Sequence, residues 1–213
     1  MGRTGHPGPA PPLPRGRGLT AVEERPWRLF VAADIPEEVR TEAARRRDGL
    51  RASIPQGRWP PKENWHLTLR FLGSVPSAAI DEVAAIVETT AVRHDRFDAA
   101  LEGLGAFSSV RRARVLWVGV TDGAERLPAL ARDLNLALGA FEPLEDRPFV
   151  PHLTLARFNP PVAVAEALSS SSWDRQVFEV AEIVLYRSHL GRPTSRFEVL
   201  ARSLLRSDRR LTT

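Results

Sequence analysis

The order of hydrophobic and polar positions predicts a mixture of strands and helices between residues 27 and 205. Short apolar runs or two-residue alternation, bounded by glycine and proline, are typical of strands. Helices are indicated where apolar residues recur at spacings of three and four, or where proline opens a polar segment. The strands are expected at residues 27–34, 64–72, 97–107, 114–120, 150–157, 176–187 and 196–205. The helices are expected at residues 36–54, 77–87, 122–141 and 162–171.

These elements follow one another in the order β-α-β-α-β-β-α-β-α-β-β. Because the order does not consist of strict βαβ repeats, it favours an α+β fold in which helices cover one face of a mainly antiparallel sheet. The first and second parts of the order are nearly the same, which indicates an internal duplication.

The ends of the chain differ in composition from this folded part. Residues 1–18 are rich in glycine and proline and show no apolar periodicity, so they bury too little surface to fold. We therefore expect a disordered tail at residues 1–25, a single domain at residues 26–206 and a frayed tail at residues 207–213.

Several classes of protein are excluded by what the sequence lacks. Without cysteine there is no disulfide framework, no Cys-ligated metal and no thiol nucleophile. No apolar run approaches the 18 residues that a membrane-spanning helix needs, and no signal-peptide core follows Arg3. We therefore expect a cytoplasmic protein. The sequence has no coiled-coil pattern and no exposed apolar helix, which favours a monomer.

The formal net charge of +4 suggests nucleic-acid binding only at first sight. Residues 1–18 carry a net charge of +3, and residues 202–213 carry another +3. The segment between them therefore has a net charge of −2. Because the positive charge lies at the ends of the chain, overall basicity does not identify a partner.

The most informative feature of the sequence is a repeated tetrapeptide. His-Leu-Thr-Leu at residues 66–69 recurs at residues 152–155, 86 positions later. In a strand, each histidine and its threonine share one face, while the two leucines point the other way, into the core. Two such strands from two similar halves would place two imidazoles and two hydroxyls around one point.

This set of side chains suits phosphoryl chemistry. Imidazole transfers protons near neutral pH, so His66 and His152 on opposite sides of a phosphorus atom would act as acid and base. Threonine hydroxyls can donate to phosphate oxygens, and Arg157 or Arg70 would neutralise phosphate charge. A zinc site is the alternative use of two histidines, but the motifs hold no cysteine, aspartate or glutamate to complete it.

The two motifs resemble the paired His-x-Thr-x signatures of the 2H phosphoesterase superfamily. Over residues 26–205 the chain is similar to the bacterial and archaeal RNA 2′,3′-cyclic phosphodiesterases, historically called 2′-5′ RNA ligases. The segments that carry the similarity are RLFVAADIP at 28–36, WHLTLRFLG at 65–73, RVLWVGV at 114–120, RPFVPHLTLAR at 147–157 and LYRSHL at 185–190.

The resemblance implies a bilobal α+β fold with duplicated β-α-β halves and a central cleft. It also implies hydrolysis of an RNA terminal 2′,3′-cyclic phosphate to a 2′-phosphate, without a metal or another cofactor. By this resemblance, His66 and His152 are the acid–base pair. We expect His66 to protonate the departing 3′ oxygen and His152 to activate water, and the reverse assignment stays open. The resemblance assigns Thr68 and Thr154 to phosphate binding.

Four further residues are candidates for substrate contact. Arg157 follows the second motif as in the HLTLAR pattern of the family and is the first choice for phosphate binding, with Arg70 second. Phe107 and Phe149 are candidate base contacts, although the Phe-Pro pair that the family often shows is Phe-Ser here. Two other functions stay open: hydrolysis of small cyclic nucleotides by the same residues, and non-catalytic binding of RNA ends.

Overall fold

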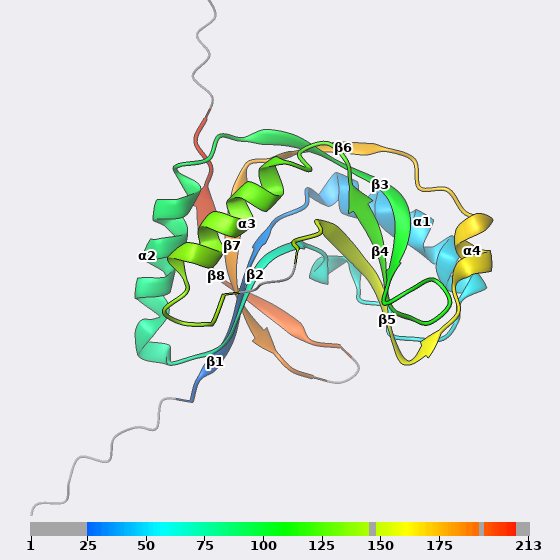
Figure 1. The fold of residues 1–213 in the computed structure, drawn as a ribbon, viewed down its shortest axis with the longest axis horizontal. Coiled ribbons are helices and arrows are strands. Elements are labelled where there is room, and N and C mark those ends of the chain that lie inside the picture. The colour runs from blue at the N-terminus through cyan, green and yellow to red at the C-terminus, as the bar shows by residue number, and fades with distance from the viewer. Residues whose placement is uncertain (1–24, 145–147, 192–193, 208–213) are drawn as a thin grey trace, which may run out of the picture.

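The computed structural model describes residues 25–144, 148–191 and 194–207 (Figure 1). The predicted tails, residues 1–25 and 207–213, lie outside the described residues except for Arg25 and Ser207. The strands are β1 (Trp27–Ala33), β2 (Leu67–Val75), β3 (Phe97–Phe107), β4 (Ala113–Val120), β5 (His152–Val162), β6 (Gln176–Val180), β7 (Glu182–His189) and β8 (Arg196–Leu204). The helices are α1 (Glu37–Ser53), α2 (Ile80–Ala91), α3 (Arg126–Ala137) and α4 (Ala165–Ser169), with short 3₁₀ turns η1 (Lys62–Asn64) and η2 (Ser77–Ala79).

The strands of the described residues form one antiparallel sheet in the order β6-β3-β4-β5-β2-β1-β7-β8. The sheet has two halves, β6-β3-β4-β5 and β2-β1-β7-β8, which join where β2 meets β5. The pairing across this junction is Leu67 with Leu153. The expected bilobal α+β fold with a mainly antiparallel sheet is thus confirmed.

One predicted strand, residues 176–187, is two strands in the structure. The first part forms β6, which pairs with β3, and the second forms β7, which pairs with β1 and β8. The chain crosses from one half of the sheet to the other at Ala181, which separates the two strands. The sequence does not reveal this crossing, because no glycine or proline separates the two strands.

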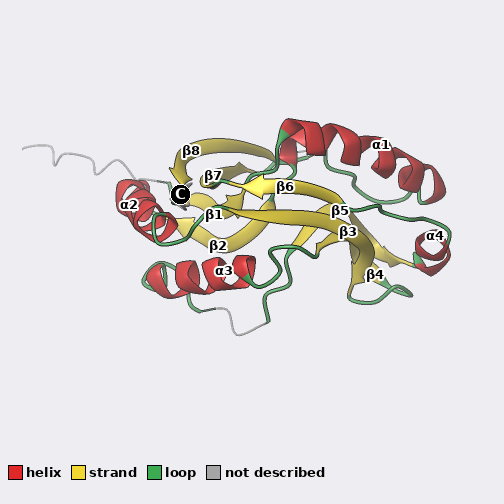
Figure 2. Ribbon diagram, turned by 90° about the horizontal axis from the view of Figure 1, so that it is seen from above, coloured by secondary structure: helices red, strands yellow, loops and turns green. Residues whose placement is uncertain are grey.

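The helices also connect the two halves. α3 follows β4 along the chain but packs against β2 of the other half, whereas α2 follows β2 and packs against β7 and β8 of the same half. Figure 2 shows α2 and α3 beside the β2-β1-β7-β8 half, and α1 and α4 beside the β6-β3-β4-β5 half. The successive units β1-α1-β2-α2 and β4-α3-β5-α4 therefore correspond, which confirms the duplicated β-α-β halves.

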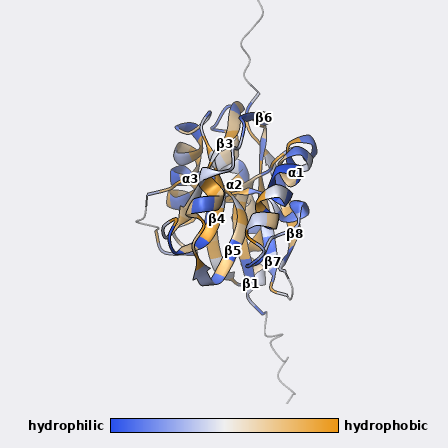
Figure 3. Cartoon of the chain, turned by 90° about the vertical axis from the view of Figure 1, so that its right-hand side faces the viewer, coloured by the Kyte–Doolittle hydropathy of each residue, from blue (hydrophilic) through white to orange (hydrophobic). Residues whose placement is uncertain are grey.

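Apolar side chains from the strands and helices form the core. The four motif leucines belong to it, each at most 5% exposed, as strand alternation predicted. In Figure 3 the hydrophobic colours gather on central strands such as β4 and β5, whereas α1 is largely hydrophilic. Within the described residues, none of the helices combines the length and apolarity that a bilayer crossing requires.

Candidate active site

The two motifs lie side by side where β2 meets β5. Because Leu67 pairs with Leu153 in antiparallel register, His66 lies opposite Thr154 and Thr68 lies opposite His152. The four side chains share the face away from the buried leucines, and the two imidazoles occupy diagonal corners. Diagonal positions on neighbouring strands are about 7–8 Å apart, which leaves space for one small group between the rings.

Each imidazole is oriented by a backbone carbonyl two residues earlier in the chain. Nδ1 of His66 lies 2.9 Å from the carbonyl oxygen of Asn64, and Nδ1 of His152 lies 2.8 Å from that of Val150. Since a carbonyl only accepts, each Nδ1 carries the proton and donates it. In the neutral ring, Nε2 then keeps its lone pair and is available to accept a proton.

His66 is enclosed by aromatic rings. The centroids of Phe30, Phe197 and Tyr186 lie 4.8, 5.2 and 6.0 Å from that of its imidazole. Burial lowers the pKa of His66 to about 4; the Asn64 carbonyl opposes this shift and the Arg157 charge adds to it. Without a bound anion, His66 is therefore neutral at pH 7.

His152 has a different aromatic neighbourhood. Its ring lies edge-on to Phe107 at 5.0 Å and 6.3 Å from Trp117. Burial lowers the pKa of His152, the Val150 carbonyl opposes the shift, and Arg157 lowers this pKa further. Because Arg157 acts on both imidazoles, its guanidinium lies within electrostatic reach of both.

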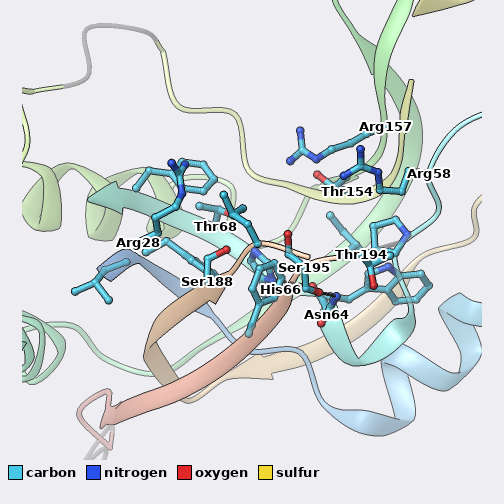
Figure 4. A pocket seen from close by; sticks show the side chains of 18 of the residues that line it. Arg28, Arg58, Asn64, His66, Thr68, Thr154, Arg157, Ser188, Thr194 and Ser195 are labelled. Atoms are coloured by element: carbon cyan, nitrogen blue, oxygen red, sulfur yellow. Dashed lines mark hydrogen bonds between the residues drawn. The ribbon is translucent and has the colours of Figure 1, made fainter. Parts of the chain in front are cut away.

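A pocket of about 550 Å³ opens beside the motifs (Figure 4). Of the predicted residues it is lined by His66, Thr68, Thr154 and Arg157. His152 is not among the lining residues, whereas Leu153, Thr154 and Arg157 of the same segment are. The predicted base contacts do not line it either: Phe107 packs on His152, and Phe149 packs against the core.

A bulge in β2 changes which side chains reach the cleft. Thr68 pairs with Ala32 of β1 and Arg70 pairs with Val31, so the register skips Leu69. Paired residues share a face of the sheet, and Val31 belongs to the core face. Arg70 therefore turns into the core, although simple alternation from the motif predicted that it would face the cleft.

Arg70 is thus not placed to contact phosphate. Its side chain is 2% exposed, and Nη2 donates to the carbonyls of Glu142 and Pro143 at 2.8 and 2.7 Å. The expectation that Arg70 is a second phosphate ligand is wrong, because alternation along a strand does not anticipate the extra residue of a bulge. The hydrogen bonds of Arg70 instead hold the segment after α3 against β2.

The second motif carries the same bulge. Thr154 pairs with Trp117 and Ala156 pairs with Leu116, so the register skips Leu155. The next residue to face the cleft is Arg157, and its counterpart in β2 is Phe71. Both line the pocket, so the two halves place a guanidinium and a phenyl ring at equivalent positions.

Arg58 joins Arg157 at the pocket. The two residues exchange backbone hydrogen bonds of 2.8 and 2.9 Å, and both side chains line the pocket (Figure 4). Within the described residues no carboxylate pairs with either guanidinium. Burial and then the Arg58 charge lower the pKa of Arg157, which indicates that the two cations repel each other. Such a pair is suited to binding an anion.

No signal in the sequence selects Arg58 or Asn64. Arg58 lies in a loop between α1 and η1, and only its pairing with Arg157 places it at the site. Asn64 orients His66 through its carbonyl, and its side-chain amide donates to the carbonyl of Ser195 at 2.7 Å (Figure 4). That bond ties the β7–β8 connection to the cleft.

The match to known proteins agrees with this geometry. The family model described as the 2′-5′ RNA ligase superfamily matches residues 32–192, which include both motifs. A curated relative from Geobacillus stearothermophilus, named RNA 2′,3′-cyclic phosphodiesterase, is 35% identical over 182 residues. The match covers 81% of this chain and 55% of the relative, so the chain spans about half of that relative's length.

Solved structures show a similar fold over most of the chain. The protein TT0787 of Thermus thermophilus superposes with a TM-score of 0.72 at 29% identity, covering 85% of this chain and 99% of that one. Escherichia coli LigT complexed with 3′-AMP superposes with a TM-score of 0.67 at 28% identity, covering 84% and 98%. The family match covers both motifs, and the structure places these motifs side by side on β2 and β5. The chain therefore belongs to the 2′-5′ RNA ligase superfamily.

Proposed function

We propose that this chain hydrolyses an RNA terminal 2′,3′-cyclic phosphate to a 2′-phosphate. The observation that carries the proposal is the diagonal arrangement of His66 and His152, each with Nδ1 bound to a carbonyl and Nε2 available. The name of the Geobacillus relative and the 3′-AMP bound to E. coli LigT support a nucleotide phosphate as the substrate.

The position of the pocket supports one division of roles between the histidines. The nucleoside occupies the pocket, which His66 lines, so the departing 3′ oxygen lies next to His66. Water approaches from the other side, next to His152, in line with the bond that breaks. His66 is therefore the general acid and His152 the general base.

The reaction balances with these two groups alone. Nε2 of neutral His152 takes a proton from water as the water oxygen bonds to phosphorus. The bond from phosphorus to the 3′ oxygen breaks, and Nε2 of protonated His66 gives that oxygen a proton. Because burial keeps the pKa of His66 near 4 in the empty site, the acid form depends on the bound phosphate anion, which raises this pKa.

The remaining polar groups stabilise charge on the phosphate. Thr68 and Thr154 lie at the other two corners of the paired motifs, where their hydroxyls can donate to non-bridging oxygens. Arg58 and Arg157 supply positive charge beside them. Donors fixed in place before the reaction lower the barrier, since they need no reorganisation as charge develops.

The test is hydrolysis of an oligonucleotide that ends in a 2′,3′-cyclic phosphate, followed in EDTA. We expect His66→Ala and His152→Ala each to lower kcat by roughly 10²–10⁴-fold, the usual contribution of a general acid or base. His94→Ala is the matched control, because His94 pairs with Asp133 away from the pocket. Loss of wild-type activity in EDTA, or normal turnover by either histidine variant, would contradict the proposal.

A further inference from the structure

The pocket extends away from the arginine pair. Figure 4 shows Arg28 at one end and Arg58 with Arg157 at the other, and His66 lies between them. The phosphate site accounts for the arginine pair and the motifs. It leaves the end near Arg28 without a role.

Phe71 lines this end of the pocket and is unusually exposed for a phenyl ring in a strand. It is 51% exposed, and its ring centroid lies 6.0 Å from that of Phe30, at the edge of the aromatic group around His66. It occupies the position in the first motif strand that Arg157 occupies in the second, and both side chains line the pocket. An exposed phenyl face there is suited to stacking on a nucleobase.

Arg28 lies beyond Phe71, further from the proposed phosphate site. Phe71 pairs with Phe30 of β1, and Arg28 lies two residues further along that strand on the same face, a step of about 6.6 Å. Arg28 is exposed, and within the described residues no carboxylate pairs with its guanidinium. Glu142 lines the same end, and a carboxylate there can accept from amino groups of a base.

We propose that Phe71 and Arg28 form a subsite for the polynucleotide chain. The phenyl ring stacks on the base of the terminal nucleotide, and the guanidinium binds the phosphodiester that joins this nucleotide to the preceding one. The subsite rests on the proposed function and extends it, because it makes the RNA end a better substrate than a mononucleotide. A mononucleotide has no such phosphodiester for Arg28 to bind.

The test compares a nucleoside 2′,3′-cyclic phosphate with a dinucleotide that ends in the same group. We expect Arg28→Ala to lower kcat/KM for the dinucleotide at least tenfold more than for the mononucleotide, as loss of a charge-assisted hydrogen bond implies. Phe71→Leu should lower kcat/KM for both by about tenfold, because both carry the stacked base. Arg51→Ala, which removes an exposed guanidinium of α1 outside the pocket, is the matched control.

A second substrate isolates the charge. In a dinucleotide whose linking phosphate is an uncharged methylphosphonate, the extra effect of Arg28→Ala should disappear. Equal losses on mononucleotide and dinucleotide, or no loss on either, would overturn the subsite while wild-type activity still upholds the proposed function. If the wild-type chain cleaves neither substrate, the proposed function itself fails.

Discussion

At the scale of single residues, we propose different tasks for two histidines that share the same local geometry. Each is held by a carbonyl two residues earlier, so each presents Nε2 to the cleft side of the paired strands. The surroundings differ: three aromatic rings enclose His66, and Phe107 with Trp117 flank His152. The difference in enclosure, and the pocket beside His66, are what separate acid from base in our proposal.

The low pKa of His66 predicts that the fold loses stability in acid. An unfolded histidine binds its proton below about pH 6.5, whereas folded His66 resists it down to about pH 4. The His66 contribution to the free energy of unfolding is therefore complete above pH 6.5 and falls as the pH drops to 4, by about 3 kcal/mol.

Urea unfolding at pH 4 and pH 7 measures this effect. The wild-type free energy of unfolding should fall more steeply between the two than that of His66→Gln, which cannot titrate at this position. Parallel pH dependences in the two proteins would show that the ring is not held neutral by the fold.

The sequence could predict those parts of the site that depend on neighbouring residues in one strand. It could not predict the parts that depend on pairing with distant segments of the chain. The repeated tetrapeptide identified the four side chains at the junction, because strand alternation alone determines their common face. It misplaced Arg70, because the bulge at Leu69 depends on pairing with β1. Arg58 could not be found at all, since its place depends on a backbone pairing with a residue 99 positions later.

At the scale of elements, the paired bulges decide what the cleft contains. In each motif strand the second leucine and the residue after it both turn towards the core, and the following side chain returns to the cleft. One half thus offers Phe71 and the other offers Arg157. The order of elements was predictable from periodicity, but the division of residues 176–187 between two halves was not, because it depends on strand partners.

The loop that carries Arg58 depends on one glycine. Gly57 has a φ of +94°, and a Cβ there would lie 2.4 Å from the ring of Phe158. Gly57→Ala should therefore destabilise the fold by about 1–3 kcal/mol and displace Arg58, raising KM for the cyclic phosphate.

Gly49→Ala is the matched control for this substitution. A Cβ on Gly49 meets nothing within 4 Å, and the residue lies inside α1, where alanine favours the helix. Thermal unfolding and steady-state kinetics of both variants check the prediction. If Gly57→Ala matches wild type in both measurements, the pairing of Arg58 with Arg157 does not depend on the glycine.

At the scale of the whole molecule, the net charge of the chain does not determine the charge of the pocket. We propose that residues 26–206 are the catalytic unit. Deleting residues 1–18 removes Arg3, Arg15 and Arg17 and reduces the formal net charge from +4 to +1. The pocket keeps its arginines.

This deletion should leave both the activity and its salt dependence unchanged. The slope of log kcat/KM against log salt for a cyclic-phosphate dinucleotide should match that of the full chain, because the slope counts the phosphates that the protein contacts. Arg58→Ala should make the slope shallower. A shallower slope for the deletion variant would instead show that residues 1–18 contact the RNA.

The crossing at Ala181 bears on how the proposed substrate would enter the cleft. Two lobes joined by long linkers can swing open on a hinge, but here β6 and β7 belong to different halves with one residue between them. The direct pairing of β2 with β5 and the packing of α3 against β2 add further restraints. We therefore expect the cleft to be preformed, so that the RNA end we propose as substrate enters a rigid site and is selected by its fit, without closure of the two halves.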